Sequence, residues 1–201
     1  MVIINISGEL NSVLERIGGM CFMAESNLNL CMDGFMKHKV DLIDEARKVS
    51  PTIYNEGNEL RKLLSDKVKE ADVNREWIKS LMSIIGSIEM EVTGLDSVLQ
   101  HVRTKISEGI LFSDKAVSEI HHLFKETLDI LKTAGDTLVT MNEVLMKYVV
   151  DKYKNLDEIV ESYAEGHEER LIKGLCQPQA SPVYLNIMDS IMTVVWHVKQ
   201  A

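Results

Sequence analysis

Glutamate, aspartate and histidine side chains at helical spacing are the residues of this chain that could bind a metal ion. Glu56 interrupts an apolar stripe between Ile53 and Leu60, and His167 takes the equivalent place in a later stripe. A charge inside an apolar seam needs a partner, a metal or a shifted pKa. The two side chains could be ligands that face each other across a bundle core. The interpretation we favour is that each simply bonds to a neighbour.

A second group of carboxylates lies farther along the chain, at Glu89, Glu91 and Asp96. Carboxylates at such spacings can coordinate divalent cations through oxygen. The inward positions of this segment, however, belong to Ile88, Val92 and Leu95. We therefore expect Glu89 and Asp96 to flank the seam, Glu91 to point mostly outward, and the whole group to form a solvated face.

Other catalytic patterns are sparse. Glu119-x-x-His122 has the spacing found in di-iron bundles, but such a centre needs a second copy and two further glutamates, and no second copy exists. The sequence has no glycine-rich phosphate-binding loop, and no serine or cysteine lies in a strand-turn-helix elbow that would make it a nucleophile. We therefore expect no enzyme activity, no cofactor and no metal, with Glu89, Asp96, Glu56 and His167 as the weak metal candidates.

The elements that position these residues are helices with a duplicated apolar pattern. Apolar residues at alternating steps of four and three mark one stripe of a helix, and two such stripes recur 110 positions apart: Leu14, Ile17, Cys21, Ala24, Leu28, Cys31 and Phe35, then Phe124, Thr127, Leu131, Ala134, Leu138, Met141 and Leu145. The first helix-to-helix junction, Met36-Lys37 with Val40-Asp41, recurs as Met146-Lys147 with Val150-Asp151. This self-similarity predicts an internal repeat.

Two further pairs of stripes complete the repeat. The second helix has Leu42, Ala46, Val49, Ile53, Leu60 and Leu63, matched by Tyr153, Leu156, Val160, Tyr163 and Leu171. The third has Ile78, Leu81, Ile85, Ile88, Val92, Leu95, Leu99, Val102 and Ile106, matched by Tyr184, Ile187, Ile191, Val194 and Val198. The sequence thus predicts an all-α fold of two tandem three-helix bundles, 1–109 and 110–201, related by a pseudo-twofold repeat. Its helices are expected at 8–38, 41–69, 74–107, 113–148, 151–175 and 181–200.

Local signals support those boundaries. Capping residues occur at Asp72-Val73-Asn74 and Ser113-Asp114, and Gly109 and Gln177-Pro178 interrupt the apolar pattern. Pro51 removes one backbone hydrogen bond inside the second helix, which predicts a kink or break near Val49.

Composition excludes several classes of protein. The net charge is −9 with lysines and acids interspersed, so we expect no nucleic-acid binding. No apolar run is long enough to span a bilayer and no export signal is present, so we expect a cytoplasmic protein. Cys21, Cys31 and Cys176 are odd in number and two lie on the core stripe, which favours structural thiols over disulfides.

On this architecture the chain resembles the PhoU-like family of phosphate-uptake regulators, whose members are tandem three-helix bundles. Glu9-Leu10 with Gly18-Gly19-Met20 is similar to that family's opening helix, and Tyr184-Leu185-x-Ile187-x-x-x-Ile191 is similar to the lead-in to its signature. The signature pairs Glu or Asp with Asp four residues later, typically Glu-Arg-Ile-Gly-Asp on each third helix, and the resemblance implies that it binds multinuclear clusters of iron or divalent metal ions.

This chain departs from the signature. The matching stretch of the last helix is Met192-Thr193-Val194-Val195-Trp196, without either carboxylate. On the third helix Glu89 pairs with Thr93, and Gly86 with Met90. Glu15-Arg16-Ile17-Gly18-Gly19 has similar letters, but it lies on the first helix and ends in glycine.

The resemblance implies a non-enzymatic regulator of phosphate homeostasis. Such proteins contact a phosphate transporter component or a sensor histidine kinase and reach the membrane only through that partner. Related domains also form cytoplasmic tails of sodium–phosphate cotransporters, and a homodimer is compatible with the pattern. The alternatives are a helical interaction module unrelated to phosphate and a metal-binding helical-bundle protein.

Overall fold

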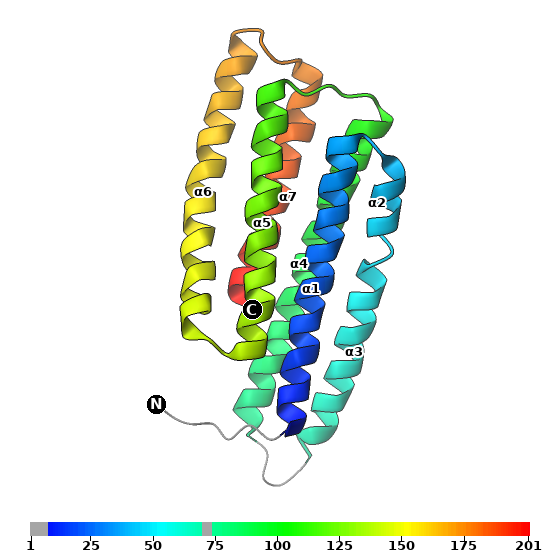
Figure 1. Cartoon of the computed structure of the whole chain (residues 1–201), viewed down its shortest axis with the longest axis vertical. Coiled ribbons are helices and arrows are strands. Elements are labelled where there is room, and N and C mark those ends of the chain that lie inside the picture. Colours follow the sequence, from blue (N-terminus) through cyan, green and yellow to red (C-terminus); the bar gives the residue numbers. More distant parts are fainter. Residues whose placement is uncertain (1–7, 70–73) are drawn as a thin grey trace.

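A computed structural model describes residues 8–69 and 74–201, and within these ranges the fold is all-α without a strand. Figure 1 shows an elongated bundle. Its elements are α1 (Gly8–Lys37), α2 (Val40–Ala46), α3 (Ser50–Lys67), α4 (Arg75–Ser107), α5 (Asp114–Thr140), α6 (Glu143–Ile172), a 3-10 turn η1 (Pro178–Ala180) and α7 (Ser181–Gln200). The predicted fold class is confirmed.

Four helices form the centre of the bundle. Corresponding helices of the two repeats make the most extensive contacts, α1 with α5 and α4 with α7, in antiparallel pairs (Figure 1). The pair α2–α3 covers α1 and α4 on one flank, and α6 covers α5 and α7 on the opposite flank. The chain division expected after residue 109 falls in the connection between α4 and α5; the division into two three-helix repeats that together form one helical domain stays a prediction.

The core follows the apolar stripes. All seven residues predicted on α1 are buried, as are Tyr184, Ile187, Ile191, Val194 and Val198 of α7. On α4 every predicted residue is buried except Ile106, which is partly exposed. The outer helix α6 has few fully buried side chains: Val149, Leu156 and His167. Most of its apolar stripe is therefore only half-buried.

The predicted break at Pro51 is confirmed. Helix α2 ends at Ala46 and α3 begins at Ser50, with the proline in the first turn of α3. A proline is tolerated there because the first-turn N–H groups have no intrahelical acceptor. Asn74 and Ser113 cap α4 and α5 through their side-chain oxygens, as expected; the neighbouring residues 72–73 lie outside the described residues.

The predicted boundary between the fourth and fifth helices was wrong. The apolar pattern predicted helices at 113–148 and 151–175, whereas α5 ends at Thr140 and α6 already begins at Glu143. Met141 adopts a left-handed conformation with φ 51°, which ends α5. Met141 and Leu145 therefore do not continue the α5 stripe, and the segment 146–151 lies inside α6 rather than at a junction.

The heptad period of the apolar stripe explains why the boundary between these two helices was predicted wrongly. His38, with φ 53°, ends the first helix in the same conformation as Met141, 103 positions later. At this offset Ile17, Leu28 and Phe35 correspond to Ile120, Leu131 and Leu138, which are all buried. The offset of 110 differs by one heptad, so it also superimposes apolar positions on apolar positions. The stripe alone cannot distinguish the two registers.

Two glycines allow the central helices to approach closely. A Cβ atom on Gly18 would lie 2.7 Å from a methyl group of Val139 and 3.1 Å from the carbonyl oxygen of Gly135, where α1 meets α5. A Cβ atom on Gly94 would lie 2.9 Å from a methyl group of Val194, where α4 meets α7. Because both contacts involve the neighbouring helix, these glycines determine the distance between the two repeats.

Candidate functional site

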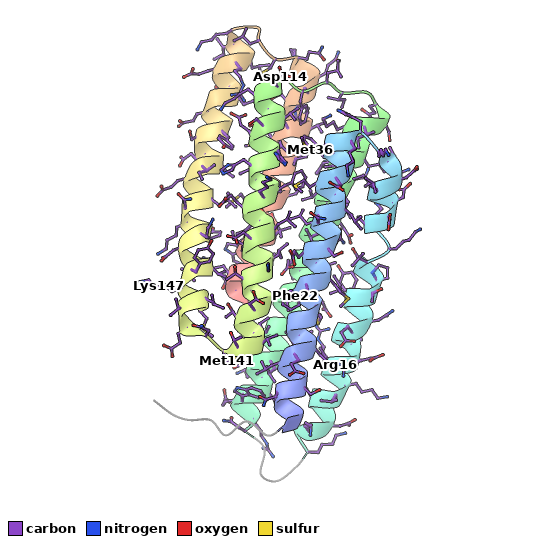
Figure 2. All side chains as sticks on the ribbon, in the orientation of Figure 1. Arg16, Phe22, Met36, Asp114, Met141 and Lys147 are labelled. Atoms are coloured by element: carbon purple, nitrogen blue, oxygen red, sulfur yellow. The ribbon has the colours of Figure 1, made fainter. Side chains whose placement is uncertain are left out.

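Glu56 and Glu89, two of the expected metal candidates, are engaged in ion pairs. Glu56 on α3 accepts a hydrogen bond from Nε of Arg16 on α1 at 2.6 Å, on the side of α1 where Figure 2 labels Arg16. Glu89 on α4 accepts two hydrogen bonds from the guanidinium of Arg61 on α3, one of them at 2.6 Å. Their carboxylates therefore join the outer helix α3 to the central helices.

Asp96 belongs to a polar chain across three helices. Its Oδ1 accepts a hydrogen bond from the Ser50 hydroxyl at 2.7 Å, and that hydroxyl accepts one from Nδ2 of the fully buried Asn27 at 3.2 Å. An open hollow of about 370 Å³ adjoins this chain, lined by Arg47, Ser50, Pro51, Tyr54, Asp96 and Gln100. These side-chain hydrogen bonds join α1 and α4 to the first residue of α3, directly after the break between α2 and α3.

His167 lies on the opposite flank, so it does not face Glu56. Its Nε2 is 2.9 Å from the Ser181 hydroxyl, and its ring stacks on Tyr184 at a centroid distance of 4.5 Å. Burial, with a smaller contribution from the Arg170 cation, lowers the pKa of His167 below its ordinary value. The imidazole is therefore neutral at pH 7 and acts as a packing group in the contact between α6 and α7.

Glu119 is the centre of a buried cluster at the same end of the bundle. It accepts two hydrogen bonds from Arg170, at 3.1 and 2.6 Å, and one from the Tyr184 hydroxyl at 2.6 Å. His122, three residues on, bonds instead to the Tyr163 hydroxyl at 2.9 Å. The two side chains of the Glu119-x-x-His122 pattern therefore bond to different partners.

Glu91 was predicted to point outward, and this was wrong. It is completely buried on α4, and neither carboxylate oxygen has a hydrogen-bond partner. Burial raises its pKa well above the ordinary value and so favours the protonated, neutral form of the carboxyl in the folded protein. Sequence reasoning missed it because Glu91 lies three residues after Ile88 and four before Leu95, a position that widens the apolar stripe without belonging to its heptad ladder.

Lys105 was also missed. It is buried, and its ammonium lies 5.1 Å from the ring centre of Phe35 and 5.0 Å from that of Phe112. Burial lowers its pKa. The only signal in the sequence was its spacing of three residues from Val102, which places its aliphatic stem on the apolar face.

The residues do not assemble into a metal centre in the part of the chain that is described. No three His, Cys, Asp or Glu side chains there gather in a way that could hold an ion. No described helix is long and apolar enough to cross a bilayer. The absence of a bound metal or cofactor in solution stays a prediction.

Two more hollows lie on the surface. The first, of about 340 Å³, is an apolar groove where the ends of α5 and α7 meet the starts of α4 and α6, and its lining includes Trp77, Leu138, Met141, Val149 and Val198. Figure 2 labels Met141 at this end of the molecule. The second, of about 240 Å³, lies between α6 and α7 and is lined by Tyr153, Asp157, Asp189, Met192, Thr193 and Trp196. Both offer contact surfaces rather than an enclosed reaction chamber.

Comparison with known proteins finds matches among solved structures. No protein-family model matches the sequence, and no curated protein matches it. Among solved structures, PhoU from Pseudomonas aeruginosa superimposes with a TM-score of 0.86 at 14% identity, over 97% of this chain and 94% of that chain. The phosphate transport system regulatory protein PhoU from Streptococcus pneumoniae gives 0.82 at 11% identity, over 95% and 90%. The chain therefore has the PhoU-like fold, in agreement with the resemblance seen in its sequence.

Proposed function

We propose that the protein is a non-enzymatic regulator of inorganic phosphate uptake that acts in the cytoplasm through contacts with a phosphate transporter component or its sensor kinase. The observation that carries the proposal is the agreement of fold over nearly the whole chain with two PhoU structures, one of which is described as a regulatory protein of a phosphate transport system.

The chemistry of the described side chains supports an adaptor. Three acidic residues whose spacing could suit a metal site are instead engaged in ion pairs between helices: Glu56, Glu89 and Glu119. The outer helix α6, by contrast, is half-exposed along its length and adjoins both the apolar groove and the hollow beside α7. Exposed apolar side chains beside charged ones are typical of protein contact surfaces.

Uptake measurements test the proposal directly. Cells that lack the gene should take up radiolabelled phosphate at an altered rate in phosphate-rich medium, and a plasmid copy should restore the wild-type rate. Uptake of an unrelated anion such as sulfate is the control. Unchanged phosphate uptake and unchanged expression of the transporter in the deletion strain would remove the proposal.

A cross-linking experiment tests the mode of action. A photoreactive residue placed at Lys147, an exposed position near the start of α6 (Figure 2), should form a covalent adduct with a transporter or kinase component. The same probe at Lys62, an exposed residue on the opposite flank, is the matched control. Recovery of only unrelated proteins from both positions would favour a helical interaction module outside phosphate transport.

The metal-binding alternative is tested by elemental analysis. Protein purified without chelators should contain much less than one equivalent of iron or zinc. Near-stoichiometric metal that disappears in Glu89→Gln or His167→Ala would favour the metal-binding alternative instead.

A further inference from the structure

The hollow between α6 and α7 has different side chains at its two ends. Tyr153 and Asp157 are one helical turn apart on α6, while Asp189, Met192 and Trp196 follow one face of α7. The two helices are antiparallel (Figure 1). Tyr153 therefore lies toward the Trp196 end of the hollow and Asp157 toward the Asp189 end. One end is aromatic and the other is anionic.

The carboxylates of the hollow are available for a partner. Within residues 8–69 and 74–201, neither the Asp157 nor the Asp189 carboxylate has a salt bridge or a hydrogen bond. Asp189 does act electrostatically on His101 of α4, but burial lowers the pKa of that imidazole and so favours its neutral form. Two like charges at one end of a cavity repel each other and favour an incoming cation. This contrasts with Glu56, Glu89 and Glu119, whose charges are neutralised by arginine inside the fold.

The aromatic end is also suited to a cationic side chain. Trp196 is 45% exposed, and its ring is held edge-on against His197 at a centroid distance of 4.7 Å. One face of Tyr153 is already occupied by the Lys199 ammonium, 4.2 Å from its ring centre, so at this end the apolar stem of a basic side chain fits better than its charged head. The aliphatic stem of a long basic residue packs well against such rings and against Met192.

The distance between the two ends fits one extended basic side chain together with an apolar neighbour. Asp189 and Trp196 are seven residues apart, or about 10 Å along a helix axis. Two carboxylates and two neutral hydroxyls, those of Tyr153 and Thr193, are a poor site for a hard divalent cation, which takes about six or more oxygen ligands, mostly from carboxylates, carbonyls and water. Met192 and Trp196, which occupy the signature positions where the family resemblance implies carboxylates, supply none. A planar guanidinium, by contrast, can bond to two carboxylates at once.

We propose that the α6–α7 hollow binds an arginine or lysine side chain of a partner protein, with the charged head between Asp157 and Asp189 and the stem against Trp196. The inference deepens the proposed function and rests on it for the identity of the partner. It makes this hollow the docking point for a basic segment of the transporter or kinase component.

A small-molecule titration tests the chemistry without the partner. The probe is N-acetyl-arginine amide, and its neutral isostere N-acetyl-citrulline amide is the control. In a Trp77→Phe background Trp196 is the single tryptophan, so its indole N–H resonance reports on the hollow. The arginine probe should shift this resonance saturably, and the citrulline probe should bind at least about fivefold more weakly.

Two variants of equal charge locate the site. Asp157→Asn with Asp189→Asn should weaken binding of the arginine probe at least about fivefold. Glu161→Gln with Glu168→Gln removes two exposed charges from α6 outside the hollow and should leave binding unchanged. Circular-dichroism melting checks that both variants are folded. Equal binding of the two probes, or full arginine binding by the Asp157/Asp189 variant, would overturn the proposal.

Manganese provides the competing outcome. Mn²⁺ titrated alone should leave the Trp196 resonance unaffected up to a millimolar concentration; specific broadening that the double Asn variant abolishes would replace the proposal by a metal site. Failure of the uptake experiment is a separate result. If the arginine probe binds but phosphate uptake is unchanged in the deletion strain, the function is wrong and the site stands. If uptake is regulated equally well by the double Asn variant, the site is wrong and the function stands.

Discussion

Arg170 reaches from α6 to α5 and donates two hydrogen bonds to the carboxylate of Glu119, at 3.1 and 2.6 Å. The Tyr184 hydroxyl of α7 donates a third, at 2.6 Å. One buried carboxylate thereby joins three helices of the second repeat. Since α6 has few buried apolar side chains, this cluster is a principal constraint on its position against the central helices.

We expect Arg170→Met to destabilise the protein by about 3 kcal/mol, because the buried Glu119 charge then keeps only the exposed Lys115 ammonium, 3.7 Å away, as a cationic partner. Urea unfolding at pH 7 measures this difference. Lys173→Met, which removes the exposed pair with Glu169 on the same helix, should cost less than about 0.5 kcal/mol. Similar losses in the two variants would show that the Glu119 cluster contributes no more than a surface pair.

Glu91 gives a prediction on pH. In the unfolded chain its carboxyl titrates near its ordinary pKa, about 4.3, whereas burial raises the pKa in the folded protein. Below the unfolded pKa both states are protonated and Glu91 has no pH-dependent effect. Above it the unfolded state loses its proton first, so Glu91 lowers the free energy of unfolding as pH rises, by up to about 1.4 kcal/mol per pH unit, until the folded pKa is reached.

The measurement is the difference in free energy of unfolding between wild type and Glu91→Gln at pH 5 and pH 8. Glutamine cannot titrate, so the difference should move in favour of the variant as pH rises. Glu108→Gln, at an exposed position just after α4, controls for the general loss of one acid. A difference that is constant between pH 5 and pH 8 would mean that Glu91 is ionised, or exposed, in the folded protein.

The three thiols should differ in reactivity. Cys21 and Cys31 are 1% exposed, and burial raises the pKa of both, whereas Cys176 lies in the partly exposed connection after α6. Because the thiolate is the reactive form, iodoacetamide should modify one cysteine in the native protein and three in urea. Mass spectrometry identifies the site. Native Cys176→Ser protein that is still modified rapidly would contradict the burial of the other two.

Most of the fold was predictable because apolar periodicity and caps act locally. The stripes of α1, α4 and α7 required only their spacing, and Pro51 identified the break between α2 and α3. The boundary between α5 and α6 was not predictable from the stripe, since a heptad pattern matches itself after a shift of seven residues. The left-handed conformation of Met141, a residue type without special preference for it, ends the helix there.

The candidate site was less predictable because polar partners come from other helices. Glu56 and Glu89 appear in the sequence as unpaired acids, yet Arg16 and Arg61, which neutralise them, are distant in sequence. The hollow between α6 and α7 joins Asp157 to Asp189, and nothing in either local pattern indicates this proximity. Only the departure of Met192 and Trp196 from the family signature pointed to that face of α7.

Gly18 and Gly19 give a test of the contact between the repeats within one helix. Both lie inside α1, where alanine is intrinsically favoured over glycine by about 1 kcal/mol. A Cβ atom on Gly18 meets Val139 and the Gly135 carbonyl oxygen at 2.7 and 3.1 Å, whereas one on Gly19 meets nothing within 4 Å. We therefore expect Gly19→Ala to stabilise the protein by about 0.5–1 kcal/mol, and Gly18→Ala to destabilise it by about 1–3 kcal/mol because α1 and α5 must separate. Thermal and urea unfolding measure both changes. Stabilisation by both variants would mean that α1 and α5 are farther apart than the structure shows. The two repeats would then be joined mainly by the contact between α4 and α7.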